Sequence, residues 1–362
     1  MLITDILSTQ AIAAYMTEDA RNKIPYLGEA FFPSKKKMGI DLKWLKSHKG
    51  LGIALKASNF DAIPTIRPRG QAQMTKEQMP LFRESMIVKE TDLAELARIR
   101  EENDPYLQPI VDSLYDDVGN LVNGAEISAE KMRMQLLAPA SGNVKIAIGL
   151  EDNTAYTYDY DANGAWKSTN YMALSNPDTW DNSQTAKPLK DVREAIKYLA
   201  SKGVEATNII MNSTTFDYLL ENDQVKNALI SITGRTIDFL DDSTVKEIFS
   251  RKLGLNVITY DKMYKDTDGS DKKFYPDNYV TILGSSQVGS TWRGSTPEEL
   301  TTIGGFMDNL PQAPVDITVL PSGIAVAVQT EYKPSYTVTT TASQIVLPSY
   351  EGMDGVFVIK VK

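Results

Sequence analysis

The segment EISAEKMRMQLLA at residues 126–138 is followed almost directly by the segment NVKIAIGL at residues 143–150. The apolar residues of the first segment recur at helical spacing, and those of the second alternate as in a strand. Pro139 and Gly142 stand between the two segments and are expected to end the helix. We therefore predict a helix that is succeeded at once by a strand.

An acidic helical piece precedes this pair of elements. Its apolar stripe has spacings of three and four residues and consists of Leu107, Ile110, Leu114, Val118 and Leu121. Asn123 and Gly124 separate it from the helical piece at 126–138. Eleven acids and three bases between Val88 and Glu130 give this part of the chain a net charge of −8.

Strands and helices alternate further along the chain, which is typical of an α+β or α/β unit. AYTYDYD at 155–161 is expected to form a hairpin with the preceding strand, and DANG at 161–164 to form a turn. Helices are also expected between 188 and 284. Their starts and ends are marked by Pro188 and Gly203, by Ser213 or Thr214, and by the capping box of Thr244 with Glu247 and the stop at Gly254.

The chain ends in segments with strand character, at 317–332, 336–347 and 355–361. These strands need partners from earlier in the chain, and the long acidic helix is their natural support. The C-terminal part would then rejoin the subdomain that begins with the helices at 91–138, with residues 188–310 inserted between. We therefore predict a fold of the α+β class with more than one subdomain.

The first ninety residues have little capacity for a core of their own. Residues 1–32 carry a loose helical stripe and are expected to form an arm. Residues 33–90 contain short alternating runs interrupted by glycine and proline, which favours an extended hairpin. Seven lysines and one acid between Pro33 and Lys56 give +6 locally, so that with −9 for the whole chain the remainder carries −15.

The composition excludes several classes of protein. Of the 362 residues, 42% are hydrophobic and 23% are charged, which is close to the globular average. The absence of cysteine excludes disulfides, thiolate metal sites and a cysteine nucleophile, and the single histidine, His48, excludes multi-histidine metal sites. The net charge of −9 disfavours nucleic-acid binding over the whole surface, and no apolar stretch is long enough to predict a membrane span.

Motifs that suggest chemistry have simpler structural explanations. DYDANG at 159–164 matches the first half of a calcium loop, but Asn170 stands where the bidentate glutamate belongs, so a hairpin turn is favoured. DTDGSD at 266–271 also indicates a turn. The sequence has no phosphate-binding loop. We predict no catalytic, cofactor-binding or metal-binding residues, and the protein is not expected to be an enzyme.

The charge pattern favours contact between copies of the chain. A protruding basic hairpin is costly to order in a monomer, because the lost conformational entropy is not offset by burial. We expect each copy to dock its basic hairpin on the acidic helix of the next copy, head to tail. A solvated acidic surface and a nucleic-acid contact of the basic block are the alternatives. The residues predicted for the contact are Lys35, Lys36, Lys37, Lys43, Lys46, Lys49, Glu101, Glu102, Asp112, Asp116 and Asp117.

In its order of elements the sequence resembles the lambda-type major capsid proteins of tailed bacteriophages. The likeness spans nearly the whole chain and is most specific in the helix and strand at 126–150 and in the tail TEYKPSYTVTTTASQIVLPSYEGMDGVFVIKV at 330–361. In this tail a lysine and an aromatic residue precede a turn, and the pattern S-x-x-x-L-P at 343–348 forms the last element. Where Lys-Trp is often found in the family, this chain has KPSY.

The resemblance implies the Hong Kong 97-like capsid fold. Residues 1–32 would be the N-terminal arm, 33–90 the E-loop, 91–187 with 315–362 the peripheral domain that carries the spine helix, and 188–314 the axial domain. It further implies self-assembly into the hexamers and pentamers of an icosahedral head that encloses DNA. The implied partners are other copies, scaffold, portal and decoration proteins, and non-specifically bound DNA, in a virion that is assembled in the host cytoplasm without a membrane.

Two alternative functions are left open by the sequence. A compartment shell of the encapsulin type would share the fold but would enclose an enzyme instead of DNA. A carbohydrate-binding or carbohydrate-active protein would use a platform of aromatic side chains, for which the candidates are Tyr156, Tyr158, Tyr160 and Trp166. Some relatives in the wider fold join subunits through a Lys–Asn isopeptide bond, but the sequence selects no pair for it.

Overall fold

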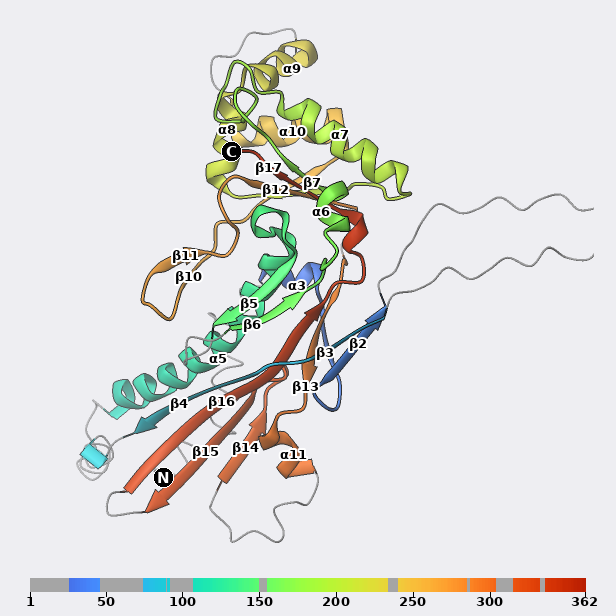
Figure 1. Ribbon diagram of the computed structural model, residues 1–362. Coiled ribbons are helices and arrows are strands. Elements are labelled where there is room, and N and C mark those ends of the chain that lie inside the picture. The colour runs from blue at the N-terminus through green and yellow to red at the C-terminus, as the bar shows by residue number, and fades with distance from the viewer. Residues whose placement is uncertain are drawn as a thin grey trace, which may run out of the picture.

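The computed structural model describes residues 26–45, 74–88, 90–91, 107–149, 155–233, 240–284, 287–303, 315–332 and 336–362. Within these ranges two larger β-sheets and a long helix, α5, form the body, and further helices surround the second sheet (Figure 1). The predicted α+β class is confirmed. The predicted arm lies mostly outside the described residues, and its last part forms the short helix α3 (Leu27–Phe31).

Helix α5 (Leu107–Leu137) is a single helix of 31 residues. The two helical pieces predicted from the sequence are therefore one element, which continues through Asn123 and Gly124. A glycine within a helix costs about 1 kcal/mol relative to alanine. Packing offsets this cost, because Val122 is buried before the glycine and Met132 is buried after it. The helix ends before Pro139 as predicted, and the short 3₁₀ helix η2 (Ala140–Gly142) follows.

The first sheet supports one side of α5. Its strands have the order β1 (Ser34–Lys36), β13 (Ser290–Gly294), β16 (Tyr336–Ser349), β15 (Ala325–Tyr332) and β14 (Val315–Val319), and β4 (Leu81–Val88) also pairs with β16. β1 is parallel to β13, and the other pairs are antiparallel. Leu121 and Val122 of α5 pack in one cluster with Val326 and other residues of this sheet. The C-terminal strands are thus supported by the long helix, as predicted.

The second sheet has a core of its own. Its strands have the order β7 (Tyr171–Ala173), β17 (Val356–Lys360), β12 (Tyr279–Leu283), β8 (Asn208–Met211) and β9 (Asn256–Thr259). The helices α7 (Pro188–Ser201), α8 (Ser213–Glu221), α9 (Asp223–Thr233) and α10 (Asp242–Leu253) lie around it at the upper end of Figure 1. Val192 of α7, Phe216 of α8 and Ile282 of β12 belong to one buried cluster, separate from the cluster beside α5.

Two helix caps differ from the prediction by a few residues. Asn212, and neither Ser213 nor Thr214, caps α8, because its side chain accepts a hydrogen bond from the backbone N–H of Thr215. Asp241 caps α10 in the same way, and Thr244 supplies the backbone donor instead of the cap. In both cases a short polar side chain upstream of the predicted cap, one residue for Asn212 and three for Asp241, reaches the free N–H groups. Pro188 and Gly254 have the predicted roles at their helix ends.

Three two-stranded hairpins complete the described fold. They are β2 (Asp41–Leu45) with β3 (Met74–Gln78), β5 (Lys145–Gly149) with β6 (Ala155–Asp159), and β10 (Met263–Lys265) with β11 (Asp271–Lys273). The turn predicted at 266–271 is confirmed. A hydrogen bond from Lys272 lowers the pKa of Asp266 to about 2, and Lys131 of α5 also contacts this carboxylate at 3.2 Å. The ion pair with Lys131 fastens the β10–β11 hairpin to the long helix, and the pair with Lys272 closes the hairpin itself.

The calcium-like segment at 159–164 starts a helix instead of closing a hairpin. The carboxylate of Asp161 accepts hydrogen bonds from the backbone N–H groups of Trp166 and Lys167 at 3.0 and 2.9 Å, so it serves the first turn of α6 (Ala165–Asn170). The prediction that it is no calcium loop is consistent with this use of its oxygen atoms. The turn predicted at 161–164 is confirmed, because the N–H of Gly164 donates to the carbonyl oxygen of Asp161 at 2.8 Å, but this turn leads into α6 and closes no hairpin. Within the described ranges no group of three or more candidate metal ligands occurs.

The strand pairing crosses the predicted domain boundaries in four strand pairs, β1 with β13, β4 with β16, β12 with β17 and β13 with β16. β17, which belongs to the predicted peripheral domain, lies in the second sheet between β7 and β12. β13, which belongs to the predicted axial segment at 188–314, lies in the first sheet between β1 and β16. The sheet to which each of these strands belongs depends on backbone hydrogen bonds to strands far away in the sequence. Local sequence patterns do not reveal such pairing. The division into an arm, an E-loop, a peripheral and an axial domain stays a prediction.

The packing of α5 on the first sheet can be tested by a cavity in that contact. Leu121 is 5% exposed, so Leu121→Ala should lower the free energy of unfolding by about 2–3 kcal/mol. The neighbouring Asn120 is exposed, and Asn120→Ala should change it by no more than about 0.5 kcal/mol. Urea denaturation of the unassembled protein, followed by circular dichroism, measures both. Equal midpoints for the two variants would contradict the packing.

Candidate inter-subunit contact surfaces

The predicted basic contact residues lie at the edge of the first sheet and on the β2–β3 hairpin. Lys35 and Lys36 are in β1, Lys37 follows this strand, and Lys43 is in β2. The remaining two, Lys46 and Lys49, lie outside the described residues. Strand pairing places β1 beside β13, so the first three lysines are part of the body of the fold and not of a separate hairpin.

Lys36 has a partner within its own chain. Its ammonium forms an ion pair with Glu299 of helix α11 (Pro297–Ile303). The adjacent Glu298 contacts Arg83 of β4 at 2.5 Å and accepts a hydrogen bond from Ser343 at 2.8 Å. Two carboxylates in the first turn of α11 therefore clamp this helix to both edges of the first sheet. The sequence prediction did not include them.

Two other lysines also have contacts within the chain, whereas Lys43 projects outward. The ammonium of Lys35 lies 5.6 Å from the ring centroid of Trp292, and that of Lys37 donates to the carbonyl oxygen of Asp41 at 2.8 Å. Lys43 is exposed, because Leu42 and Trp44 on either side of it point into the core. The contact of these lysines with a neighbouring copy stays a prediction, and Lys43 is the described lysine best placed for it.

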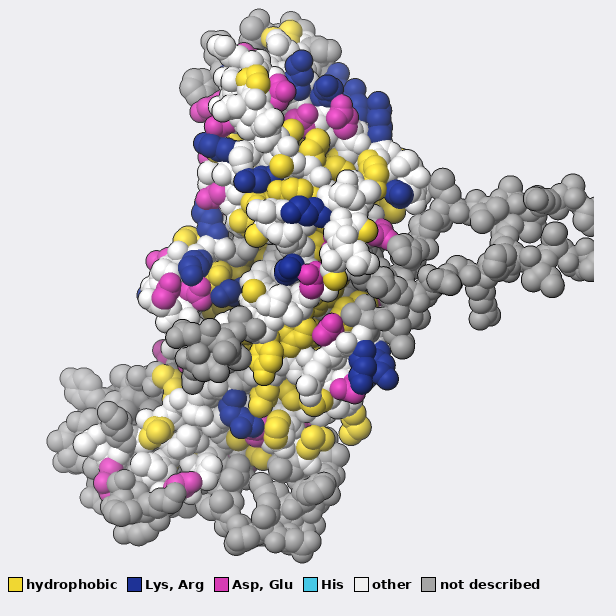
Figure 2. Space-filling view, viewed as in Figure 1, with side chains coloured by type: hydrophobic (Ala, Val, Ile, Leu, Met, Phe, Trp, Pro, Cys, Tyr) yellow, Lys and Arg dark blue, Asp and Glu magenta, His cyan; other side chains and the backbone are white. Residues whose placement is uncertain are grey.

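The predicted acidic contact residues are only partly within the described structure. Asp112, Asp116 and Asp117 belong to α5, and 112 and 116 are one helical turn apart. Glu101 and Glu102 lie outside the described residues. On the face shown in Figure 2, basic and acidic side chains are mixed over the helical end of the molecule. No broad patch of one sign is visible among the described residues there.

A fully buried ion pair on α5 was missed by the sequence prediction. Arg133 donates to Glu130 at 3.2 Å and to the hydroxyl of Thr291 in β13 at 2.9 Å, and both charged side chains are inaccessible to solvent. Glu130 also accepts hydrogen bonds from the backbone N–H of Gly28 and from the hydroxyl of Tyr260, each at 2.9 Å. The available signal was a pair of opposite charges three residues apart, with the apolar residues Met132, Met134 and Leu136 beside them.

Burial dominates the electrostatics of this pair. It raises the pKa of the Glu130 carboxyl above its usual range, although Arg133 and the N–H of Gly28 act in the opposite direction. A methyl group on Gly28 would lie 2.5 Å from the Glu130 carboxylate, so only glycine permits this close approach. The pair therefore fastens α3, and with it the chain that follows the predicted arm, to the long helix.

A second arginine joins the first sheet to α5. Arg293 of β13 is 4% exposed and donates to both carboxylate oxygens of Glu126 at 3.0 and 2.9 Å. It also donates to the side-chain oxygen of Gln344 in β16 at 3.0 Å, and Gln344 in turn donates to the carbonyl oxygen of Ala125. Such paired contacts fix the position of a guanidinium group more tightly than a single ion pair does.

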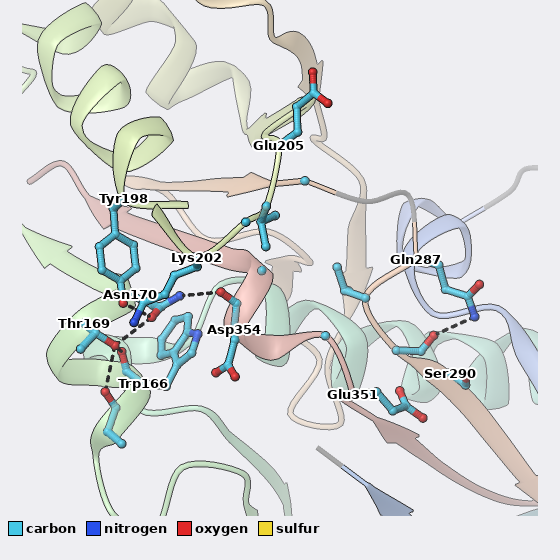
Figure 3. A pocket seen from close by; sticks show the side chains of 18 of the residues that line it. Trp166, Thr169, Asn170, Tyr198, Lys202, Glu205, Gln287, Ser290, Glu351 and Asp354 are labelled. Atoms are coloured by element: carbon cyan, nitrogen blue, oxygen red, sulfur yellow. Dashed lines mark hydrogen bonds between the residues drawn. The ribbon is translucent and has the colours of Figure 1, made fainter. Parts of the chain in front are cut away.

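A cleft of about 970 Å³ opens between the two sheets (Figure 3). Its walls come from α6, the end of α7, the segment before β13, and the connection from β16 to β17, which contains the 3₁₀ helix η4 (Met353–Gly355). Glu205, Glu351 and Asp354 line it, together with Lys202 and Trp166. Acidic groups and an aromatic ring thus share a concave surface that was not predicted from the sequence.

Comparison with known proteins identifies the family. The sequence model of phage major capsid protein E matches residues 8–334 of the chain. No curated protein matches the sequence. Because the family match covers far more than half of the chain, the chain belongs to the phage major capsid protein E family.

Solved structures show the same fold. A putative capsid protein of a prophage of E. coli CFT073 has a TM-score of 0.60 at 15% identity, over 98% of this chain and 99% of that chain. A phage-related protein from Bordetella bronchiseptica RB50 has a TM-score of 0.55 at 10% identity, over 98% and 96%. The capsid of cyanophage A-1(L) has a TM-score of 0.51 at 11% identity, over 93% and 92%.

The predicted resemblance and capsid fold are therefore confirmed. A phage major capsid protein has a structural role, is a component of the virion and assembles with copies of itself. Among the described residues, no helix is both long enough and apolar enough to span a bilayer.

The buried pair gives a pH dependence of known sign. A carboxyl whose pKa is raised by folding stabilises the folded state below its unfolded pKa, and this contribution is lost as the pH rises through the folded pKa. Glu130 should therefore make the protein more stable as the pH falls from neutral towards the usual range of a glutamate. The difference in unfolding free energy between the natural protein and Glu130→Gln, measured in urea across this range, isolates the effect. If the unfolding free energy of the natural protein minus that of the variant stays constant or falls on acidification, the prediction is wrong.

Proposed function

We propose that the chain forms the hexamers and pentamers of an icosahedral phage head that encloses DNA. The observation that carries this proposal is the family match over residues 8–334, together with a capsid fold that corresponds over 98% of the chain. Scaffold, portal and decoration proteins are the further partners proposed, with non-specific contact to packaged DNA and assembly in the host cytoplasm. The role is mechanical, and no enzymatic activity is proposed.

The described strands of the predicted E-loop, β2 and β3, are held firmly on the body of the fold. Trp44 of β2 is 5% exposed, and its ring lies 5.5 Å from that of Tyr160. The hydroxyl of Tyr158 donates to the carbonyl oxygen of Gln78 in β3 at 2.9 Å. A two-stranded hairpin is marginal by itself, but these contacts hold both of its strands on the β5–β6 hairpin. This anchoring supports the proposal that the predicted E-loop makes contact with a neighbouring copy.

An exposed apolar patch beside this stem also supports self-assembly. Met38 and Ile40, in the turn between β1 and β2, are 68% and 40% exposed, and Leu81 at the start of β4 is 43% exposed. Ile40 lies next to Met79, two residues before Leu81, because its carbonyl oxygen accepts the N–H of Met79 at 2.9 Å. Neighbouring exposed apolar side chains of this kind mark contact surfaces in soluble proteins.

The alternative functions have less support. Tyr158, Tyr160 and Trp166 are buried, and only Tyr156 of the four aromatic candidates is exposed, so they form no platform for a sugar. The hydroxyl of Tyr160 and the indole N–H of Trp166 donate to backbone carbonyl groups of the chain itself. The phage family match favours a DNA-containing head over an encapsulin-type shell.

Assembly of the expressed full chain tests the proposed function. Negative-stain electron microscopy and light scattering should reveal closed shells or capsomers, because the fold presents surfaces that a monomer leaves uncovered. Nuclease-protected DNA in such particles would support a phage head. A persistent monomer, or particles that carry an enzyme as cargo, would contradict the proposal.

Charge-reversal variants distinguish an effect on the contact between copies from an effect on the stability of the single chain. Lys43→Glu should change the free energy of unfolding by no more than about 0.5 kcal/mol, because Lys43 is exposed, but should lower the assembly yield and its sensitivity to salt. Lys36→Glu is the matched contrast and should destabilise the unassembled chain by about 1 kcal/mol, because it places a carboxylate beside Glu299. If Lys43→Glu leaves the yield and its salt dependence unchanged, the proposed docking of the hairpin is wrong.

A further inference from the structure

Strand β4 forms an open border of the first sheet. It pairs with β16 on one side, and no strand of the described chain pairs with its other side (Figure 1). Six of its eight residues are exposed, among them Met86 and Ile87 at 38% and 59%. Because neighbouring residues of a strand point to opposite faces, these two side chains show that both faces are accessible. The strand is therefore open on both faces and along one edge.

The backbone groups that point out of this edge follow from the strand pairing. The N–H of Val346 donates to the carbonyl oxygen of Pro80, so the even-numbered residues of β4 hydrogen bond with β16. Ser85 and Thr341 form one of the intervening pairs, in which side chains come closer, and their hydroxyl groups are 2.8 Å apart. The outward N–H and carbonyl groups therefore belong to residues 81, 83, 85 and 87. Within the described part of the chain no hydrogen bond reaches them.

The usual devices that protect a sheet edge are missing from β4. Proline, lysine and a β-bulge are three common means by which proteins prevent an edge from pairing with another strand. The strand sequence LFRESMIV contains neither proline nor lysine, and its register with β16 continues from Leu81 to Val88 without a bulge. Its single base, Arg83, is paired with Glu298 of the same chain. The edge is therefore able to accept another strand.

A second copy of the chain fits this edge. The chain belongs to a family of capsid proteins, which assemble with copies of themselves. The inference rests on the icosahedral head of the proposed function, because such a head contains two-fold axes at which the same surface of two copies must fit itself. Two β4 strands related by a two-fold axis run antiparallel. Each strand then satisfies the outward N–H and carbonyl groups of the other.

The charges of the strand select one register for this pairing. An antiparallel pair centred on residue 83 would place Arg83 opposite its own copy, and a pair centred on residue 84 would do the same to Glu84. Like charges directly opposite each other destabilise a sheet. Centring on Ser85 avoids both, because Glu84 then faces Met86 of the second copy and Arg83 faces Ile87 of the second copy. Centring further along the strand shortens the pairing.

We propose that β4 pairs with β4 of a second copy, antiparallel and centred on Ser85, so that the first sheets of two subunits form one continuous sheet. The pairing satisfies the outward backbone groups of both strands and covers the exposed side chains of Met86 and Ile87. Other occupants do less. DNA phosphates accept hydrogen bonds but donate none, so the outward carbonyl groups would stay without a donor. A purely apolar partner would leave every outward backbone group unsatisfied.

Disulfide trapping in assembled particles tests the contact. The chain has no cysteine, so Ser85→Cys introduces the only thiol, and any disulfide that it forms joins two copies. In the proposed register the two Cα atoms are about 5.5 Å apart, a distance that a disulfide can span. Oxidation by copper phenanthroline in air should convert most Ser85→Cys chains to dimers on a non-reducing gel. Ser250→Cys, at an exposed position of α10 outside the first sheet, is the matched control and should stay monomeric on the gel.

Two opposite charges at residue 86 test the register. Met86→Glu and Met86→Lys remove the same partly exposed side chain, so the urea midpoints of the unassembled variants should agree with each other. In the assembled pair, residue 86 faces Glu84 of the second copy. Met86→Glu would therefore gather four carboxylates around the axis, and its protein concentration for half-maximal assembly should rise on the order of tenfold. Met86→Lys places opposite charges face to face and should assemble at least as readily as the natural protein.

The outcomes separate this inference from the proposed function. If particles form but Ser85→Cys gives no more dimer than Ser250→Cys, the pairing of β4 is wrong while the proposed function stands. The same conclusion holds if Met86→Glu and Met86→Lys assemble equally well. If the natural protein forms no particle and Ser85→Cys gives no dimer, both are wrong. Dimers through residue 85, together with impaired assembly of Met86→Glu but not of Met86→Lys, support both.

Discussion

The buried pair of Glu130 and Arg133 constrains the rest of the described fold. Removing two charges from water costs several kcal/mol for each ion, and the loss is recovered only when nearly every oxygen and N–H group finds a partner. Here the partners come from three distant segments, through Gly28, Tyr260 and Thr291. The N-terminal segment, the chain just after β9 and the first sheet must therefore meet at one point on α5, because a shift of any of them would remove a hydrogen bond from a buried charged group.

The periodic elements could be predicted because local forces determine them. The stripe of α7, opened by Pro188, and the strands of the C-terminal tail required no knowledge of the tertiary structure. Gly124 was misinterpreted as an interruption, because its intrinsic penalty of about 1 kcal/mol is smaller than the gain from packing the helix on both sides of it. The caps Asn212 and Asp241 lie upstream of the residues predicted from the sequence. Several nearby polar residues can cap these helices, and the geometry of the folded chain selects among them.

The candidate contact surfaces could be predicted only in part, because sequence reveals charge but not the partner of a charge. Lys36 is paired with Glu299, which is 263 residues away and becomes its neighbour only because β1 lies parallel to β13. Glu130 was concealed for the opposite reason, since a charged residue within an apolar run is easily taken for part of a solvated face. Lys43, between two buried neighbours on a strand, is the case in which alternation alone indicates an outward direction.

The cleft connects these local findings to the behaviour of the whole subunit. The chain leaves the first sheet at Ser349 and enters the second at Val356, so the short connection between β16 and β17 forms the cleft floor and links the two sheets. Glu351 lies on this connection. The two sheets are also joined by packing, because one buried cluster contains both Val346 of β16 and Val358 of β17. A displacement of either sheet is therefore opposed by packed side chains as well as by the short connection.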